Sequence, residues 1–155
     1  MRWTPEQTRD AFAGSRVARL ATVTETGQPH LVPVTFAVIG DTIAVAIDTK
    51  PKRTKNLKRL ANIEANPNVC LLVDHYSDDW QQLWWARADG TARIVHAGTE
   101  RDHALARLRE RYPQYHADPP EGPVILAAID RWSGWSFRQY RQCCEDLEGG
   151  DRRAG

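Results

Sequence analysis

Hydrophobic residues alternate with polar or small residues along several short stretches of the chain, a spacing that is typical of β-strands. These stretches are residues 17–23, 30–39, 42–48, 69–75, 84–95 and 124–129. The last could extend through Trp135 and Phe137. Gly27 and Gly40 lie in the short links between the first three, so we expect these strands to pair as antiparallel hairpins. Pro33 interrupts the second strand and predicts a bulge or an unpaired edge there.

Three other segments have the spacing and the end signals of helices. Residues 4–7 (Thr-Pro-Glu-Gln) combine a capping residue, a proline for the first helical position and a glutamine that completes a capping box. Apolar residues recur with a helical period over residues 57–63, and Asn66-Pro67-Asn68 would end that helix. A third helix is expected to begin near Thr99 and to end at Pro113.

Hairpin strands with helices between them predict an α+β fold that is mainly β. A small antiparallel barrel is favoured over a doubly wound parallel sheet, which would need βαβ units. Asp89-Gly90 marks a bulge or a turn within the long strand at residues 84–95. The 155 residues are enough for one domain, which we place at 1–142. Residues 143–155 are polar and glycine-rich, and are expected to be a disordered tail.

Charge and composition narrow the class of protein. The net charge of +1 argues against a general nucleic-acid binder. No apolar stretch approaches the ~20 residues that span a bilayer, and the N-terminus lacks the apolar region of a signal peptide. Cys70, Cys143 and Cys144 have no metal-site spacing and are expected to be reduced thiols. We therefore expect a cytoplasmic protein with no membrane partner.

Cations gather where a strand gives way to a helix, in Lys50-Pro51-Lys52-Arg53-Thr54-Lys55-Asn56-Leu57. A helix N-terminus already carries partial positive charge and free N–H groups, so cations normally avoid it. A bound anion, most commonly a phosphate, would explain them. The alternatives are a solvated basic turn and a sequence-tolerant nucleic-acid patch.

Tryptophan is unusually frequent, at six residues in the chain. Trp84 and Trp85 are adjacent in an expected strand, so their side chains should point to opposite faces. Both cannot enter one core, and one should face a dimer partner or a planar ligand, although packing could account for any single tryptophan.

Familiar catalytic motifs are absent from the sequence. It contains no G-x-S-x-G, H-E-x-x-H, C-x-x-C or Walker motif. His75-Tyr76 with Asp78-Asp79 could form a small metal or acid/base cluster, but a polar loop is the simpler interpretation. We expect no protein nucleophile and no metal site. An enzyme of this kind would depend on a cofactor for its chemistry.

Several segments together resemble the flavin/deazaflavin oxidoreductase superfamily, the split β-barrels related to pyridoxamine 5′-phosphate oxidase. The resemblance extends from Arg16 to about Phe137. It is carried by residues 19–23 (RLATV), 27–30 (GQPH), 32–36 (VPVTF), 52–57 (KRTKNL), 66–69 (NPNV) and 85–92 (WARADGTA). Within the superfamily the sequence looks most like the actinobacterial branch that uses coenzyme F420. The fold that this implies is a six-stranded antiparallel split β-barrel with flanking helices.

The resemblance also implies where a cofactor would bind. It implies a homodimer with two cofactor sites at the subunit interface. The cofactor phosphate would bind to Lys52, Arg53, Lys55 and Asn56. The ring would lie over Pro33, Val34, Thr35 and Phe36, with Ile47 and Asp48 alongside. Arg87 and one or more of Trp80, Trp84 and Trp85 would come from the partner subunit. Members of such families transfer hydride directly between cofactor and substrate, so no catalytic residue is assigned.

Charge bears on the choice between F420 and FMN. F420 carries an oligoglutamate tail, and Lys58 with Arg59 extends the basic patch along the helix. We therefore predict an F420-dependent oxidoreductase acting on a small organic substrate that the sequence does not identify. The alternatives are an FMN-dependent enzyme of the pyridoxamine-phosphate oxidase type and a non-catalytic protein that binds flavin, F420 or haem.

Overall fold

One antiparallel sheet organises the protein. The computed structural model describes residues 1–47 and 53–138, with the backbone alone over 53–57. The strands are β1 (Ala18–Val23), β2 (Pro29–Val34), β3 (Ala37–Ile39), β4 (Thr42–Ala46), β5 (Asn68–His75), β6 (Trp84–Val95) and β7 (Val124–Ser136). The helices are α1 (Pro5–Gly14), α2 (Arg53–Ala65), α3 (Thr99–Arg111) and α4 (Gln114–Ala117), with a 3₁₀ turn, η1 (Trp80–Gln82).

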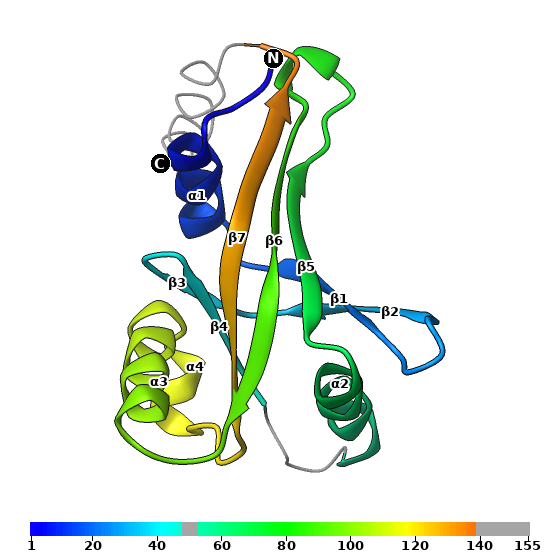
Figure 1. Ribbon diagram of the computed structural model, residues 1–155. Helices are drawn as coiled ribbons and strands as arrows, with labels where there is room; N and C mark the ends of the chain where they lie inside the picture. The colour runs from blue at the N-terminus through cyan, green and yellow to red at the C-terminus, as the bar shows by residue number, and fades with distance from the viewer. Residues whose placement is uncertain (48–52, 139–155) are drawn as a thin grey trace.

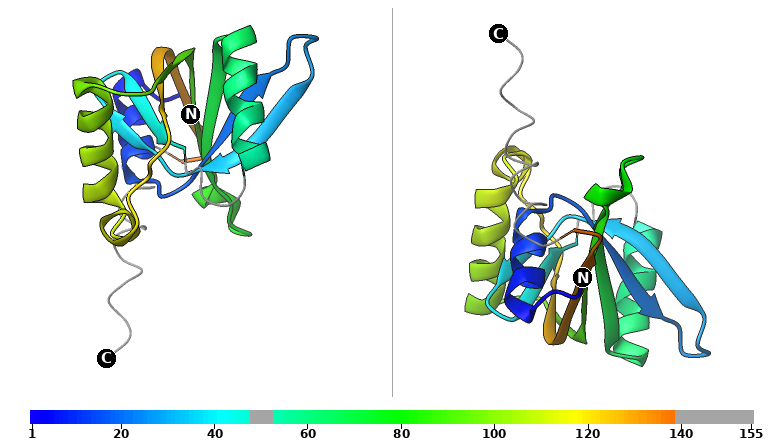
Figure 2. Two further views of the ribbon diagram at one scale, coloured as in Figure 1. Left: turned by 90° about the horizontal axis from the view of Figure 1, so that it is seen from below. Right: turned by 90° about the horizontal axis from the view of Figure 1, so that it is seen from above.

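The strands follow the order β2-β1-β5-β6-β7-β4-β3. Every adjacent pair is antiparallel. The long strands β5, β6 and β7 run side by side through the molecule, with the β1–β2 hairpin on one side and β3–β4 on the other (Figure 1). Helices α1 and α3 lie beside β7 and β3, with α4 against α3, whereas α2 lies beside β1 and β6 (Figure 2). The antiparallel, mainly β fold with flanking helices is therefore confirmed.

The predicted barrel of six strands requires a correction. The described residues form seven strands, and β2 and β3 occupy the two edges of the sheet without pairing with each other, so closure into a barrel is not confirmed. The extra strand arises because the stretch expected at residues 30–39 is divided at Thr35-Phe36. There the backbone N–H of Phe36 donates to the Tyr112 hydroxyl (3.2 Å) instead of a strand partner.

The helix signals in the sequence are confirmed. Helix α1 begins at Pro5 with the complete capping box between Thr4 and Gln7. Helix α2 ends at Ala65, immediately before Asn66-Pro67. Helix α3 ends at Arg111, two residues before Pro113, and the short α4 after it was not expected. The tail predicted at 143–155, and the domain boundary at 142, lie outside the described residues.

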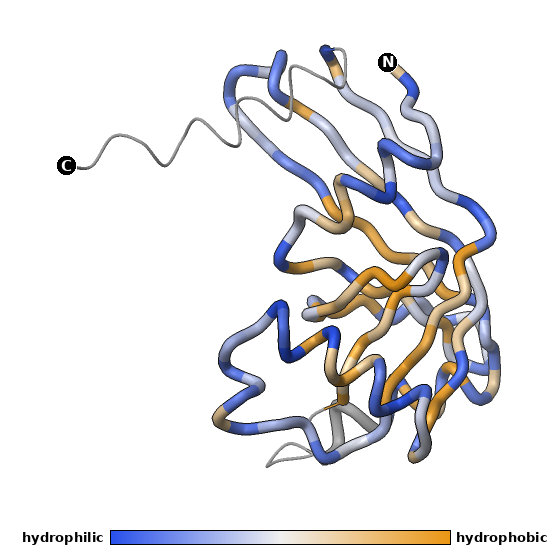
Figure 3. The backbone as a smooth tube through the Cα atoms, turned by 90° about the vertical axis from the view of Figure 1, so that its left-hand side faces the viewer, coloured by the Kyte–Doolittle hydropathy of each residue, from blue (hydrophilic) through white to orange (hydrophobic). Residues whose placement is uncertain are grey.

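Two hydrophobic clusters hold the layers together. The larger fills one side of the sheet and includes Phe12 of α1, Phe36 and Ile63 of α2. The smaller packs Leu108 and Tyr112 of the α3 region against β4 and β7. Hydrophobic positions gather in the middle of the crossing strands, and polar positions at their ends (Figure 3).

A bulge in the long β6–β7 pair keeps the apolar side chains of β7 on the core side both before and after it. The register shifts between Asp89 and Gly90, opposite Arg131 and Ile129. One residue of β7, Asp130, is thus unmatched, and both Trp132 and Ile129 can point into the core. The predicted bulge at Asp89-Gly90 is therefore confirmed.

Candidate functional site

The segment predicted to lie under a cofactor ring spans the end of β2 and the link to β3. Val34 and Phe36 are buried in the main core, at 5% and 0% exposure. Pro33 is exposed and Thr35 is half-buried. Only Pro33 and Thr35 therefore offer side chains to a ligand outside the core.

Ile47 joins the same cluster at the end of β4. Its side chain is 1% exposed and packs in the core that contains Val34 and Phe36. Its backbone N–H donates to the carbonyl of Pro123 (3.0 Å). The structure thus brings three of the predicted residues into one buried wall. The neighbouring predictions Asp48 and Lys52 lie outside the described residues.

Helix α2 begins at Arg53, so the predicted phosphate residues Arg53, Lys55 and Asn56 belong to its first turn. That turn contains no acidic residue. The side chains of 53–57 lie outside the described part of the structure, and their role as phosphate ligands stays a prediction.

Positive charge continues along α2 toward β2. Desolvation lowers the pKa of His30 on β2, and the charges of Lys58 and Arg59 lower it further. Burial also lowers the pKa of Arg59. The Nδ1 atom of His30 is buried and has no hydrogen-bond partner in the described structure. His30 was not singled out from the sequence, because its proximity to α2 is a tertiary contact.

Predicted residues from distant parts of the sequence share one face of the sheet. We call the outward side chains of β2, β1, β5 and β6 the open face: Leu31, Pro33, Arg19, Ala21, Cys70, Leu72, Asp74, Trp85, Arg87 and Asp89. These side chains are exposed or half-buried in the single chain. Cross-strand neighbours link Pro33 to Arg19, Leu72 and Arg87 in one row. At ~4.8 Å per strand, Pro33 and Arg87 are roughly 14 Å apart.

Arg87 is already paired within the chain. Its Nε donates to both carboxylate oxygens of Asp89, at 2.9 Å each. Asp89 thereby raises the pKa of Arg87. Burial, reinforced by Asp89, raises the pKa of the neighbouring Cys70 thiol to about 11, so this cysteine is a protonated, weakly reactive group. Residues two positions apart in a strand point to the same face of the sheet. The spacing of Arg87 and Asp89 is therefore the sequence signal that could have identified them as partners.

The tryptophans divide as the strand alternation predicted. Trp84 points into the core, 8% exposed, with its ring centroid 5.5 Å from that of Trp3. Trp85 points outward and is 38% exposed, and Trp80 in η1 is 63% exposed. An outward tryptophan is therefore confirmed. Its contact with a partner or a ligand stays a prediction.

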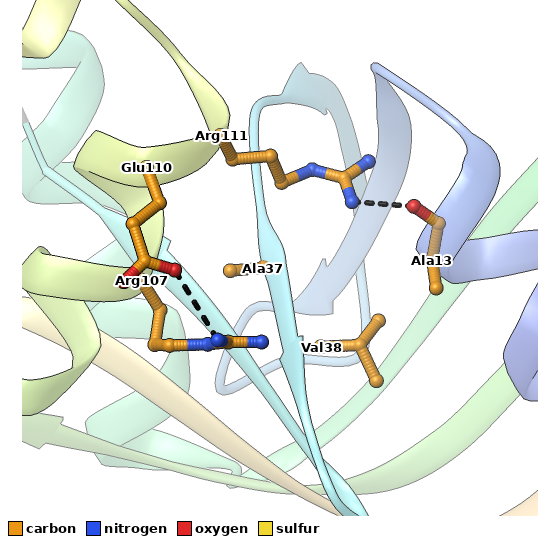
Figure 4. Close-up of a pocket in the computed structure, with 6 residues that line it drawn as sticks. All are labelled: Ala13, Ala37, Val38, Arg107, Glu110 and Arg111. Atoms are coloured by element: carbon orange, nitrogen blue, oxygen red, sulfur yellow. Dashed lines mark hydrogen bonds and ion pairs between the residues drawn. The ribbon is translucent and has the colours of Figure 1, made fainter.

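A cleft of about 310 Å³ lies between α1, β3 and α3, and none of the predicted site residues lines it (Figure 4). It is lined by Ala13, Ala37, Val38, Arg107, Glu110 and Arg111. Arg107 and Glu110, neighbours on α3, form an ion pair on one side of it (3.2 Å), and Arg111 donates to the carbonyls of Ala13 and Ser15 at the end of α1. Arg111 thus satisfies free carbonyls at a helix C-terminus, which is a structural role.

Among residues 1–47 and 53–138, no group of three or more His, Cys, Asp or Glu side chains is placed to hold a metal, and this includes the loop after His75. None of the helices in the described part of the chain is long and apolar enough to cross a membrane.

The described chain is thus a small protein built on one antiparallel sheet, which carries both the buried wall and the open face. The sequence model of the pyridoxamine 5′-phosphate oxidase family matches residues 4–136, and the chain belongs to this family. A comparison with curated proteins found no significant match.

Solved structures with the same fold include proteins named for flavin and haem binding. A conserved hypothetical protein from Mycobacterium tuberculosis is 24% identical with a TM-score of 0.67, over 88% of this chain and 86% of that chain. An FAD-binding protein from Mesorhizobium loti is 20% identical with a TM-score of 0.66, over 86% and 95%. A heme-binding protein from Mycobacterium smegmatis is 18% identical with a TM-score of 0.64, over 89% and 60%. At these identities the likeness shows the fold, and the F420-using branch stays a prediction.

Proposed function

We propose that this chain is an oxidoreductase that binds coenzyme F420 and uses it to transfer hydride to or from a small organic substrate. The observation that carries the proposal is the basic first turn of α2, which has cations and no acidic residue. Cations at this end of a helix oppose the helix dipole unless an anion lies between them. A cofactor phosphate fits this set of donors.

The tail of F420 is the reason for preferring it over FMN. FMN ends at its phosphate, whereas F420 continues into several carboxylates. Lys58 and Arg59 follow the phosphate turn, and their charges lower the pKa of His30 on β2. A positive region of this kind, beyond the phosphate residues, favours the longer anion.

Each group of residues would have a separate task. Lys52, Arg53, Lys55 and Asn56 would hold the phosphate, and Pro33, Val34, Thr35 and Phe36 would support the ring, with Ile47 and Asp48 alongside. A bound deazaflavin would supply the ring carbon that accepts or donates hydride. Val34, Phe36 and Ile47 would support the ring through their backbone, because their side chains are buried in the core. No acid or base of the chain is assigned to the reaction.

The proposal includes a homodimer in which two copies share each site. Trp85 and Arg87 lie on the open face, exposed in the single chain, and Trp80 is more exposed still. Pairing of two open faces would bring Trp80, Trp85 and Arg87 of the partner subunit toward the ring. The exposed apolar side chains of this face, Leu31 and Trp85, favour such burial.

Equilibrium titrations with three ligands test the cofactor. We expect F420 to bind with an affinity that falls as salt is added, and a deazaflavin without phosphate and tail to bind at least tenfold more weakly. Tighter binding of FMN, independent of the tail-binding residues Lys58 and Arg59, would replace this proposal with an FMN enzyme. Tight F420 binding without reoxidation of the reduced cofactor by any acceptor would indicate a carrier protein. Failure to bind any of the three would refute the proposal.

A further inference from the structure

Two tyrosines just after the end of α3 form hydrogen bonds to the link between β2 and β3, residues 35–36. Tyr112 is the residue after α3, and Tyr115 lies in α4. Their rings are 5.8 Å apart in an edge-to-face arrangement. Both hydroxyls bond to the link, Tyr112 at Phe36 and Tyr115 at Thr35.

Tyr112 fixes the backbone of the link. Its side chain is 6% exposed, and its hydroxyl accepts the N–H of Phe36 at 3.2 Å. The same hydroxyl lies 3.1 Å from the carbonyl oxygen of Phe36 and 2.8 Å from that of Arg16, and its single proton can serve one of them at a time. The Tyr112 side chain thus connects the link to the residues just before β1. Its hydrogen bonds replace the backbone hydrogen bonds that a continuous strand would make with a neighbouring strand.

Arg111 supports the same corner. Its guanidinium lies 5.0 Å from the Phe36 ring centroid and is anchored by the carbonyls at the end of α1 (Figure 4). The Phe36 ring also meets Phe12 of α1 edge-on, at 5.8 Å. The position of Phe36 is therefore determined from three sides.

Tyr115 acts on the one polar side chain of the link. Its hydroxyl is 2.7 Å from the Thr35 hydroxyl, the usual distance for a hydrogen bond between two hydroxyls. Each hydroxyl has one proton and can accept from its neighbour. When Tyr115 donates to Thr35, the proton of Thr35 remains available for another acceptor. Thr35 is half-buried, so this proton can reach a ligand in contact with the link.

We propose that Tyr115 is a positioning residue for the cofactor: it orients the Thr35 hydroxyl so that Thr35 donates a hydrogen bond to an acceptor atom of the bound ring, while Tyr112 holds the backbone beneath it. This inference rests on the proposed function, because it requires the ring to lie over residues 33–36. Its chemistry is shared by flavins and deazaflavins, both of which carry ring carbonyls and nitrogens as acceptors.

The test compares Tyr115→Phe and Thr35→Val with the parent protein in two measurements. The first is hydrogen exchange of residues 34–37 without cofactor, which reports on the tyrosine contact alone. The second is titration with F420, read as dissociation constant and as absorption spectrum of the bound ring. Tyr76→Phe is the matched control, because Tyr76 is exposed and its hydroxyl donates to nearby Asp78, away from the link.

We expect Tyr115→Phe to speed exchange at residues 34–37, to raise the dissociation constant roughly three- to tenfold, and to shift the bound spectrum. Thr35→Val should shift the spectrum in the same direction, and the double variant should add little to either change. Tyr76→Phe should match the parent throughout.

Other outcomes overturn the inference in distinguishable ways. Faster exchange with unchanged affinity and spectrum would refute the positioning role and leave the proposed function standing. Unchanged exchange together with unchanged affinity and spectrum would refute any effect of the tyrosine contact on the link. A parent protein that binds no flavin or deazaflavin would refute the proposed function and this role of Tyr115 together.

Discussion

Lys55 is the residue on which the predicted phosphate site depends most. Lys55→Ala removes a charge-assisted contact with the phosphate and should weaken F420 and FMN binding by about 1.5–3 kcal/mol, or one to two decades. Stability of the free protein should stay level or rise slightly, because one of several crowded cations is removed. Lys58→Ala, a turn further along α2, should matter little for FMN and more for F420. Equal binding by Lys55→Ala and the parent would show that the phosphate lies elsewhere.

His30 makes the stability of the protein depend on pH. Burial and the neighbouring cations lower its pKa, so the unfolded chain binds the proton more readily than the folded protein. Stability is then full above the ordinary value of about 6.5 and falls as the pH drops through that value and the lowered one. Urea unfolding at about pH 7.5 and about pH 5.5 should show a smaller acid loss for His30→Gln than for the parent. His103→Gln, on the exposed surface of α3, controls for the loss of an imidazole, and a similar rescue there would contradict the assignment to His30.

At the scale of elements, the β6–β7 bulge depends on Gly90. A Cβ at this position would lie 2.0 Å from the carbonyl oxygen of Ala128, a backbone atom that cannot move aside alone. Gly90→Ala should therefore destabilise the fold by roughly 1–3 kcal/mol or more. Gly14→Ala is the matched control: a Cβ added to this last residue of α1 would meet none of the described atoms within 4 Å, and alanine there should be neutral or stabilising by up to ~1 kcal/mol. Similar urea midpoints for the two variants would refute the close packing at the bulge.

Local signals explain which elements could be predicted from the sequence. The α1 capping box, the proline limits of α2 and α3, and the opposite faces of Trp84 and Trp85 all depend on neighbours within a few residues. The division of β2 from β3 depends on Tyr112, which is 76 residues away from Phe36. For the same reason the sequence predicted Thr35 and Phe36 as site residues but not the tyrosines that hold them.

At the scale of the whole molecule, the open face is the proposed surface between two copies. Leu31 is 66% exposed there, opposite Ala21 of β1. Leu31→Arg would place a charge against the partner's apolar side chains and should raise the dimer dissociation constant at least tenfold. Ala106→Arg, on the exposed surface of α3, adds the same charge elsewhere and should leave the dimer intact. Sedimentation at micromolar concentration distinguishes the two, and a monomeric parent would count against the shared site.

The central claim is that a flavin-type cofactor, in our proposal F420, lies between the β2–β3 link, the start of α2 and the open face. The most direct measurement is NMR mapping of amide and indole resonances during titration of the parent protein with F420. The account predicts saturable shifts at Thr35 and Phe36, in the first turn of α2, and at the indole of Trp85, with the cleft around Arg107 unchanged. Shifts confined to that cleft, or no saturable shift anywhere, would contradict it.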